Sequence, residues 1–96
     1  MDYIPPASDS RGLSCRQLAH ARIGFAQNHE RQARECELSG SVYEAMNAYG
    51  SAIGNLRNAM AVLPREAKRT IKAHMNRLEA KQMRLNRRIM FENRTH

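Results

Sequence analysis

The spacing of apolar and small residues in the middle of this chain is the feature that most constrains its fold. These residues recur every three or four positions, which is the repeat of an α-helix with one buried face. The stripe consists of Val42, Ala45, Tyr49, Ala52, Leu56, Ala59 and Leu63, and it is widened by Met46, Ile53 and Met60. A face of this width can contact two neighbours at once, so the segment is predicted to be the middle helix of a bundle.

Two further segments continue the helical pattern on either side of clear breaks. The predicted helices cover residues 14–38, 41–62 and 64–91. The first break is Ser39-Gly40-Ser41, where glycine can adopt the left-handed conformation that closes a helix. The second is Pro64, which a helix tolerates in its first turn. No alternating run rich in Val, Ile and Thr predicts a strand. We therefore predict an all-α, antiparallel three-helix bundle with up-down-up topology, a flexible lead-in at 1–13 and a frayed end at 92–96.

Alanine positions predict how the first two helices pair. Facing residues of an antiparallel pair have numbers with a constant sum, and a sum of 78 matches Ala19 with Ala59, Ala26 with Ala52, and Ala33 with Ala45. A sum of 127 likewise matches the second and third helices at Leu56 with Ile71, Tyr49 with Leu78, and Val42 with Leu85. Small residues at matched positions let two helix axes approach to about 8 Å.

Positive charge is concentrated in the last third of the chain. The formal net charge is +7, and ten of the sixteen Lys and Arg residues follow Pro64, together with three Glu. A one-sided basic helix suggests an acidic peptide, a tubulin tail, an anionic membrane surface or nucleic acid as partner. A basic face that only keeps the chain in solution is the alternative interpretation.

Neither a membrane span nor a secretory signal is predicted. No apolar run reaches about 18 residues, and residues 1–6 lack the basic and apolar regions of a signal peptide. Cys15 and Cys36 are the two cysteines, so free thiols in a reducing cytosol or nucleus are expected.

No enzyme, cofactor or metal site is predicted. Zinc sites need about four ligands at short paired spacings, and the available Cys and His residues lack such spacings: Cys15, His20, His29, Cys36 and His74. The chain also has no glycine-rich phosphate loop. Glu35 and Glu37 are two residues apart and so point to different helix faces, which does not suit acid–base catalysis.

The middle of the chain resembles the MIT domain, the microtubule-interacting and trafficking module. The resemblance rests on Ser39-Gly40-Ser41-Val42-Tyr43-Glu44-Ala45-Met46, followed by Tyr49, Ala52-Ile53, Leu56 and Ala59-Met60. Ala67-Lys68, Ile71 and Ala73 resemble the opening of the family's third helix, and Leu78-Glu79 resembles a later Leu-Asp pair. The resemblance covers roughly residues 18–90. Val42 stands where the family usually has Tyr, and the third helix is more basic than in members that bind basic peptides.

This resemblance implies a non-catalytic module that binds short C-terminal motifs of ESCRT-III-type proteins in endosomal trafficking. Such a module would be cytoplasmic and recruited peripherally to endosomal or other membranes. In one binding mode an amphipathic helix lies between the second and third helices; in another an extended segment lies between the first and third. The first mode implies a groove lined by Ile53, Met60, Met75, Leu78 and Gln82. Glu79 would then receive a basic ligand residue, while Lys72 and Arg84 would meet acidic ones. The helical pattern favours Met75 and Leu78 as core residues.

Two alternative functions use the third helix differently. Its basic residues could bind nucleic acid or acidic tubulin tails, although no aromatic residues are interleaved for base stacking and no helix-turn-helix spacing occurs. Alternatively the chain could be a structural bundle that self-associates through the seam from Ile71 to Ile89, which has coiled-coil spacing. A monomer is favoured, and the apolar run Ile89-Met90-Phe91 has no predicted cover.

Overall fold

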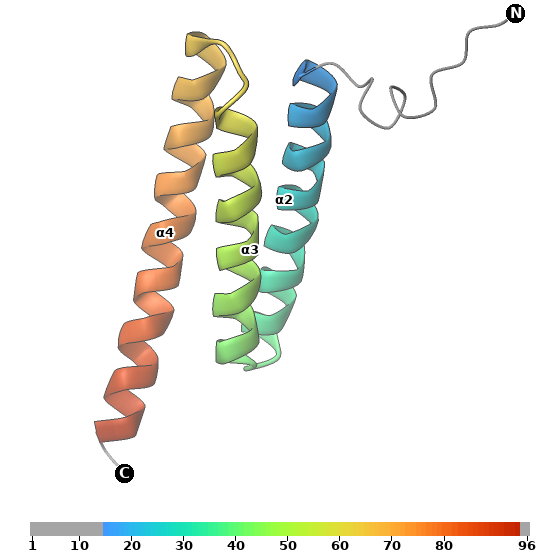
Figure 1. The fold of residues 1–96 in the computed structure, drawn as a ribbon. Coiled ribbons are helices and arrows are strands. Elements are labelled where there is room, and N and C mark those ends of the chain that lie inside the picture. The colour runs from blue at the N-terminus through green and yellow to red at the C-terminus, as the bar shows by residue number, and fades with distance from the viewer. Residues whose placement is uncertain (1–14, 95–96) are drawn as a thin grey trace, which may run out of the picture.

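The computed structural model of the chain describes residues 15–94, which form three antiparallel α-helices (Figure 1). They are α2 (Cys15–Leu38), α3 (Val42–Met60) and α4 (Arg65–Arg94), and no strand occurs within the described range. The predicted all-α three-helix bundle is therefore confirmed. The lead-in predicted at 1–13 lies outside the described residues. At the other end, α4 continues to Arg94, so residues 92–94 are helical where a frayed end was predicted.

The turn between α2 and α3 forms as the sequence predicts. Gly40 has φ = +86°, a left-handed backbone conformation that L residues other than glycine rarely adopt. The Gly40 N–H donates to the Glu37 carbonyl at 3.1 Å, and the Ser41 N–H donates to the Cys36 carbonyl at 2.8 Å. These two bonds define a Schellman motif, which satisfies carbonyl groups that the end of α2 would otherwise leave unpaired.

Pro64 stands immediately before α4. Its carbonyl accepts the first bond of the helix, from the Lys68 N–H at 3.0 Å. Because proline has no N–H to offer, it is compatible with this boundary but not with the interior of a helix. The helix thus begins one residue after the predicted start.

Small residues fill the contact between α2 and α3. All six alanines that the register predicted to face one another are buried: Ala19, Ala26, Ala33, Ala45, Ala52 and Ala59. Between α3 and α4 the core contains larger side chains, of which Tyr49, Leu56 and Leu78 are the largest that are fully buried. The seam from Ile71 to Ile89 is also buried inside the chain, through Ile71, Met75, Leu78, Leu85 and Ile89. The self-association hypothesis used this same seam, whose side chains are covered by the chain itself.

The middle helix α3 holds the other two helices apart. Helix α2 packs against α3, and α4 packs against α3, but α2 and α4 make no close backbone approach to each other. Figure 1 shows the resulting order, with α4 (orange) and α2 (blue) on either side of α3 (green). The bundle is therefore open, and α4 presents much of its surface to solvent.

Candidate partner-binding surfaces

Side chains fill the space between α2 and α4. His74 Nε2 of α4 lies 2.8 Å from Glu30 Oε1 of α2, and both side chains are largely buried. The Tyr49 hydroxyl of α3 donates a hydrogen bond to the Glu37 carboxylate of α2. Lys81 Nζ of α4 lies 5.7 Å from the centroid of the Tyr49 ring, within the range of a cation–π interaction. These contacts occupy the region where an extended ligand between the first and third helices was considered.

The Tyr49 phenol is held in its protonated form. Burial raises its pKa above the ordinary value of 10.0, and the Glu37 carboxylate that accepts its hydrogen bond raises the pKa further. The hydroxyl therefore stays a donor throughout the neutral pH range.

Three of the residues predicted to line a ligand groove belong to the core. Leu78 is 1% exposed, and Ile53 and Met75 are also buried. Their side chains are covered by the chain itself and offer no surface to a ligand. The preference for Met75 and Leu78 as core residues is confirmed.

The other predicted residues are at least partly exposed, but two of them, Gln82 and Glu79, already have partners within the chain. Gln82 is half-buried, and its side-chain amide donates to the Met46 carbonyl at 3.1 Å. Glu79 Oε2 lies 3.8 Å from Arg57 Nη2. The carboxylate that was predicted to bind a basic ligand residue is therefore paired within the chain. Met60 is partly buried against the core, and Lys72 is exposed.

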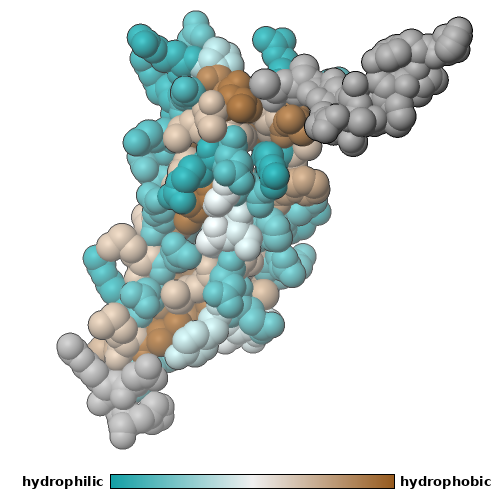
Figure 2. Space-filling model, viewed as in Figure 1, coloured by the Kyte–Doolittle hydropathy of each residue, from teal (hydrophilic) through white to brown (hydrophobic). Residues whose placement is uncertain are grey.

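A hollow of about 280 Å³ opens along the contact between α3 and α4. We call it the seam hollow; it is lined by Met46, Gln82, Met83 and Asn86. Met83 is 56% exposed, and Asn86 Nδ2 lies 3.8 Å from the sulfur of Met90. Figure 2 shows hydrophobic surface at the lower end of the molecule, where the start of α3 lies beside the C-terminal half of α4 (Figure 1). The sequence analysis did not predict Met83 or Asn86, because it drew the apolar groove residues from the apolar stripes of α3 and α4, on which neither residue lies.

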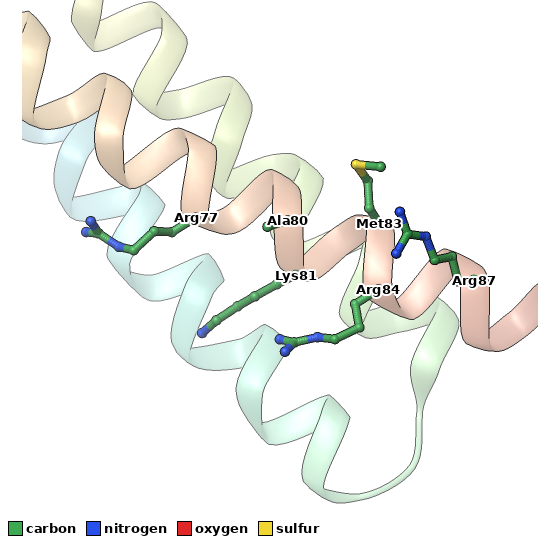
Figure 3. A pocket seen from close by; sticks show the side chains of 6 residues that line it. All are labelled: Arg77, Ala80, Lys81, Met83, Arg84 and Arg87. Atoms are coloured by element: carbon green, nitrogen blue, oxygen red, sulfur yellow. The ribbon is translucent and has the colours of Figure 1, made fainter.

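A second hollow, of about 490 Å³, lies on α4 itself. We call it the basic hollow; it is lined by Arg77, Ala80, Lys81, Met83, Arg84 and Arg87. Figure 3 shows Arg77, Lys81 and Arg84 extending to one side of α4 and Met83 to the other, with Ala80 between them. Gln82 and Arg84 were predicted to share one groove, but they line different hollows. Four of the ten cationic residues that follow Pro64 thus line one depression.

A third hollow, of about 260 Å³, lies between α2 and α3. His29 and Cys36 line it together with Gln32, Glu44, Asn47, Ala48 and Ser51.

Within residues 15–94, no three His, Cys, Asp or Glu side chains come together as a set that could hold a metal ion. None of the helices in that range has the length and apolarity needed to cross a membrane.

Comparison with known proteins identifies no relative of this chain: no protein-family model matches the sequence, and no curated protein or solved structure matches it either. The resemblance to MIT domains therefore rests on the residues quoted above and on the three-helix fold.

Proposed function

We propose that this chain is a non-catalytic protein-interaction module that binds a short amphipathic helix of a partner protein along the contact between α3 and α4. The seam hollow carries the proposal, because it is open to solvent and presents methionine side chains from both helices. Methionine adapts to ligands of varied shape. Amphipathic helices are commonly recognised by apolar grooves with polar or charged residues around them; Met46 and Met83 supply the apolar part of this hollow, and Gln82 and Asn86 supply its polar part.

The ligand class that we propose is the one that the MIT resemblance implies, a C-terminal helical motif of an ESCRT-III-type protein. Binding would recruit the chain from the cytoplasm to endosomal or other membranes. A basic ligand residue at Glu79 would have to displace Arg57. That exchange is energetically modest, because the ion pair of Glu79 with Arg57 is about half exposed and exposed pairs contribute roughly 0–1 kcal/mol.

A peptide-binding measurement tests this proposal. Fluorescently labelled C-terminal motifs of ESCRT-III-type proteins should bind the full chain, and Met83→Asp should weaken the binding about tenfold or more, since it places a carboxylate against the apolar face of the ligand. Met83→Leu keeps an apolar side chain of similar size and should bind like the wild type. Leu38→Asp is a matched control at an exposed position at the end of α2.

Two results would count against the proposal. Unchanged binding by Met83→Asp would place the ligand away from the seam hollow. Failure of every ESCRT-III-type motif to bind the folded wild-type chain would refute the ligand class. Circular dichroism of each variant establishes that it is folded, as expected for substitutions at exposed positions.

A further inference from the structure

We infer that α4 carries a second interaction surface, the basic hollow, on which an acidic helix of a partner protein docks over Ala80. This surface goes beyond the proposed function. Its lining is distinct from that of the seam hollow, and the two share one residue, Met83.

The arrangement of the lining residues matches the way one helix receives another. In helix–helix packing a side chain of one helix enters a hole formed by residues i, i+3, i+4 and i+7 of the other. Two overlapping sets with this spacing make up the basic hollow: Arg77, Ala80, Lys81 and Arg84, then Ala80, Met83, Arg84 and Arg87. Both holes share Ala80, whose small side chain leaves room for an apolar side chain of the partner to reach α4. The shape therefore favours a helix as the occupant.

The charge of the walls selects an acidic helix. Four of the six lining residues are cationic and none is acidic. Within residues 15–94, Arg77, Arg84 and Arg87 form no ion pair. Their guanidinium groups are free to pair with carboxylates in the two-bond geometry that arginine prefers. Charges that flank the contact set partner choice in helix pairs, so Asp or Glu is expected beside the apolar residue of the partner.

Other occupants fit the hollow less well. A second copy of the chain docking through this face would bring like charges together, which costs free energy. Nucleic acid could pair its phosphates with the same cations, but the hollow has no aromatic side chain for base stacking. Ala80 at its floor and Met83 at one wall suit an apolar side chain better than a phosphate.

The test uses the full chain and a designed probe. The probe is an acidic helical peptide with Leu at heptad positions a and d and Glu at e and g, and a scrambled peptide of the same composition is its control. In calorimetric titrations at near-physiological salt, we expect the heptad peptide to bind about tenfold or more tightly than the scrambled one.

Three variants identify the surface. Ala80→Met fills both holes without changing the charge, and Arg84→Glu reverses one wall charge; each should weaken binding of the heptad peptide about tenfold. Arg69→Glu makes the same charge change at an exposed position of α4 outside the hollow, and it should weaken binding less than about threefold. All three positions are exposed, and melting curves establish that each variant is folded.

Several outcomes overturn the inference. They are equal binding of the scrambled peptide, wild-type binding by Ala80→Met, or an equal loss from Arg69→Glu. Tighter binding of duplex DNA than of the peptide, with a steep dependence on salt, would assign the surface to nucleic acid. Ala80 does not line the seam hollow, so ligands of that site should bind Ala80→Met normally. Failure at one surface is thereby distinguished from failure at the other.

Discussion

At the scale of single residues, Tyr49 is the position where the three helices meet. Its ring is fully buried on α3, its hydroxyl donates to Glu37 of α2, and Lys81 of α4 lies over its face. A buried tyrosine needs a hydrogen-bond partner for its hydroxyl, and the Glu37 carboxylate supplies one. The residue thus contributes apolar burial and also orients the two outer helices.

The raised pKa of Tyr49 predicts a loss of stability at alkaline pH. The unfolded chain releases this proton near pH 10, whereas the folded chain retains it to higher pH. The stabilisation that the protonated Tyr49 hydroxyl contributes to the folded chain is therefore complete below about pH 10 and falls as the pH rises above it. Tyr49→Phe should lower the free energy of unfolding by about 1 kcal/mol at neutral pH, and its deficit relative to the wild type should shrink above about pH 10. Urea unfolding of both proteins across this range measures the difference. A deficit that stays constant would show that Tyr49 does not titrate in this way.

At the scale of helices and turns, the glycines have different roles. Gly40 takes a positive φ that ends α2, whereas Gly54 lies inside α3 with nothing within 4 Å of the position that a Cβ would occupy. The first glycine is needed for the turn. The second only adds conformational freedom to the unfolded chain.

These two glycines should respond to alanine with opposite signs. Gly40→Ala should lower the free energy of unfolding by about 1–2 kcal/mol, because an L residue is strained in the left-handed conformation. Gly54→Ala should raise it by about 0.5–1 kcal/mol, because alanine favours the helix. Each variant is the control for the other in the same urea titration. Stabilisation by Gly40→Ala would contradict the turn geometry described here.

At the scale of the whole molecule, side chains rather than backbone packing connect α2 with α4. The contact between His74 of α4 and Glu30 of α2 is a direct polar link between these two helices. Because both groups are largely buried, loss of one partner leaves the other without a hydrogen bond in a poorly hydrated site.

A double-mutant cycle on His74→Ala and Glu30→Ala measures this link. The expected coupling energy is about 1 kcal/mol. The pair formed by Arg57 and Glu79 also joins two helices but is about half exposed, so its coupling should stay below about 0.5 kcal/mol. Equal coupling in the two cycles would mean that His74 and Glu30 do not hold α2 to α4.

Much of the fold could be predicted from local patterns in the sequence. Helical periodicity predicted α3, the Ser39-Gly40-Ser41 break predicted the turn, and Pro64 predicted the start of α4 within one residue. These features depend on backbone conformations that each residue prefers by itself. The matched alanines predicted the buried face of α2 because an antiparallel pair has one register once its turn is known.

The binding surfaces needed the tertiary structure. The helical pattern of α4 favoured Leu78 as a core residue, but it did not predict that Met83 is exposed and lines two hollows. The pairing of Glu79 with Arg57 likewise depends on a residue of another helix. Helical spacing predicts that α3 has two neighbours but not the angle between them around its axis. In the structure both outer helices pack against α3 and not against each other, and the basic hollow of α4 is open to solvent.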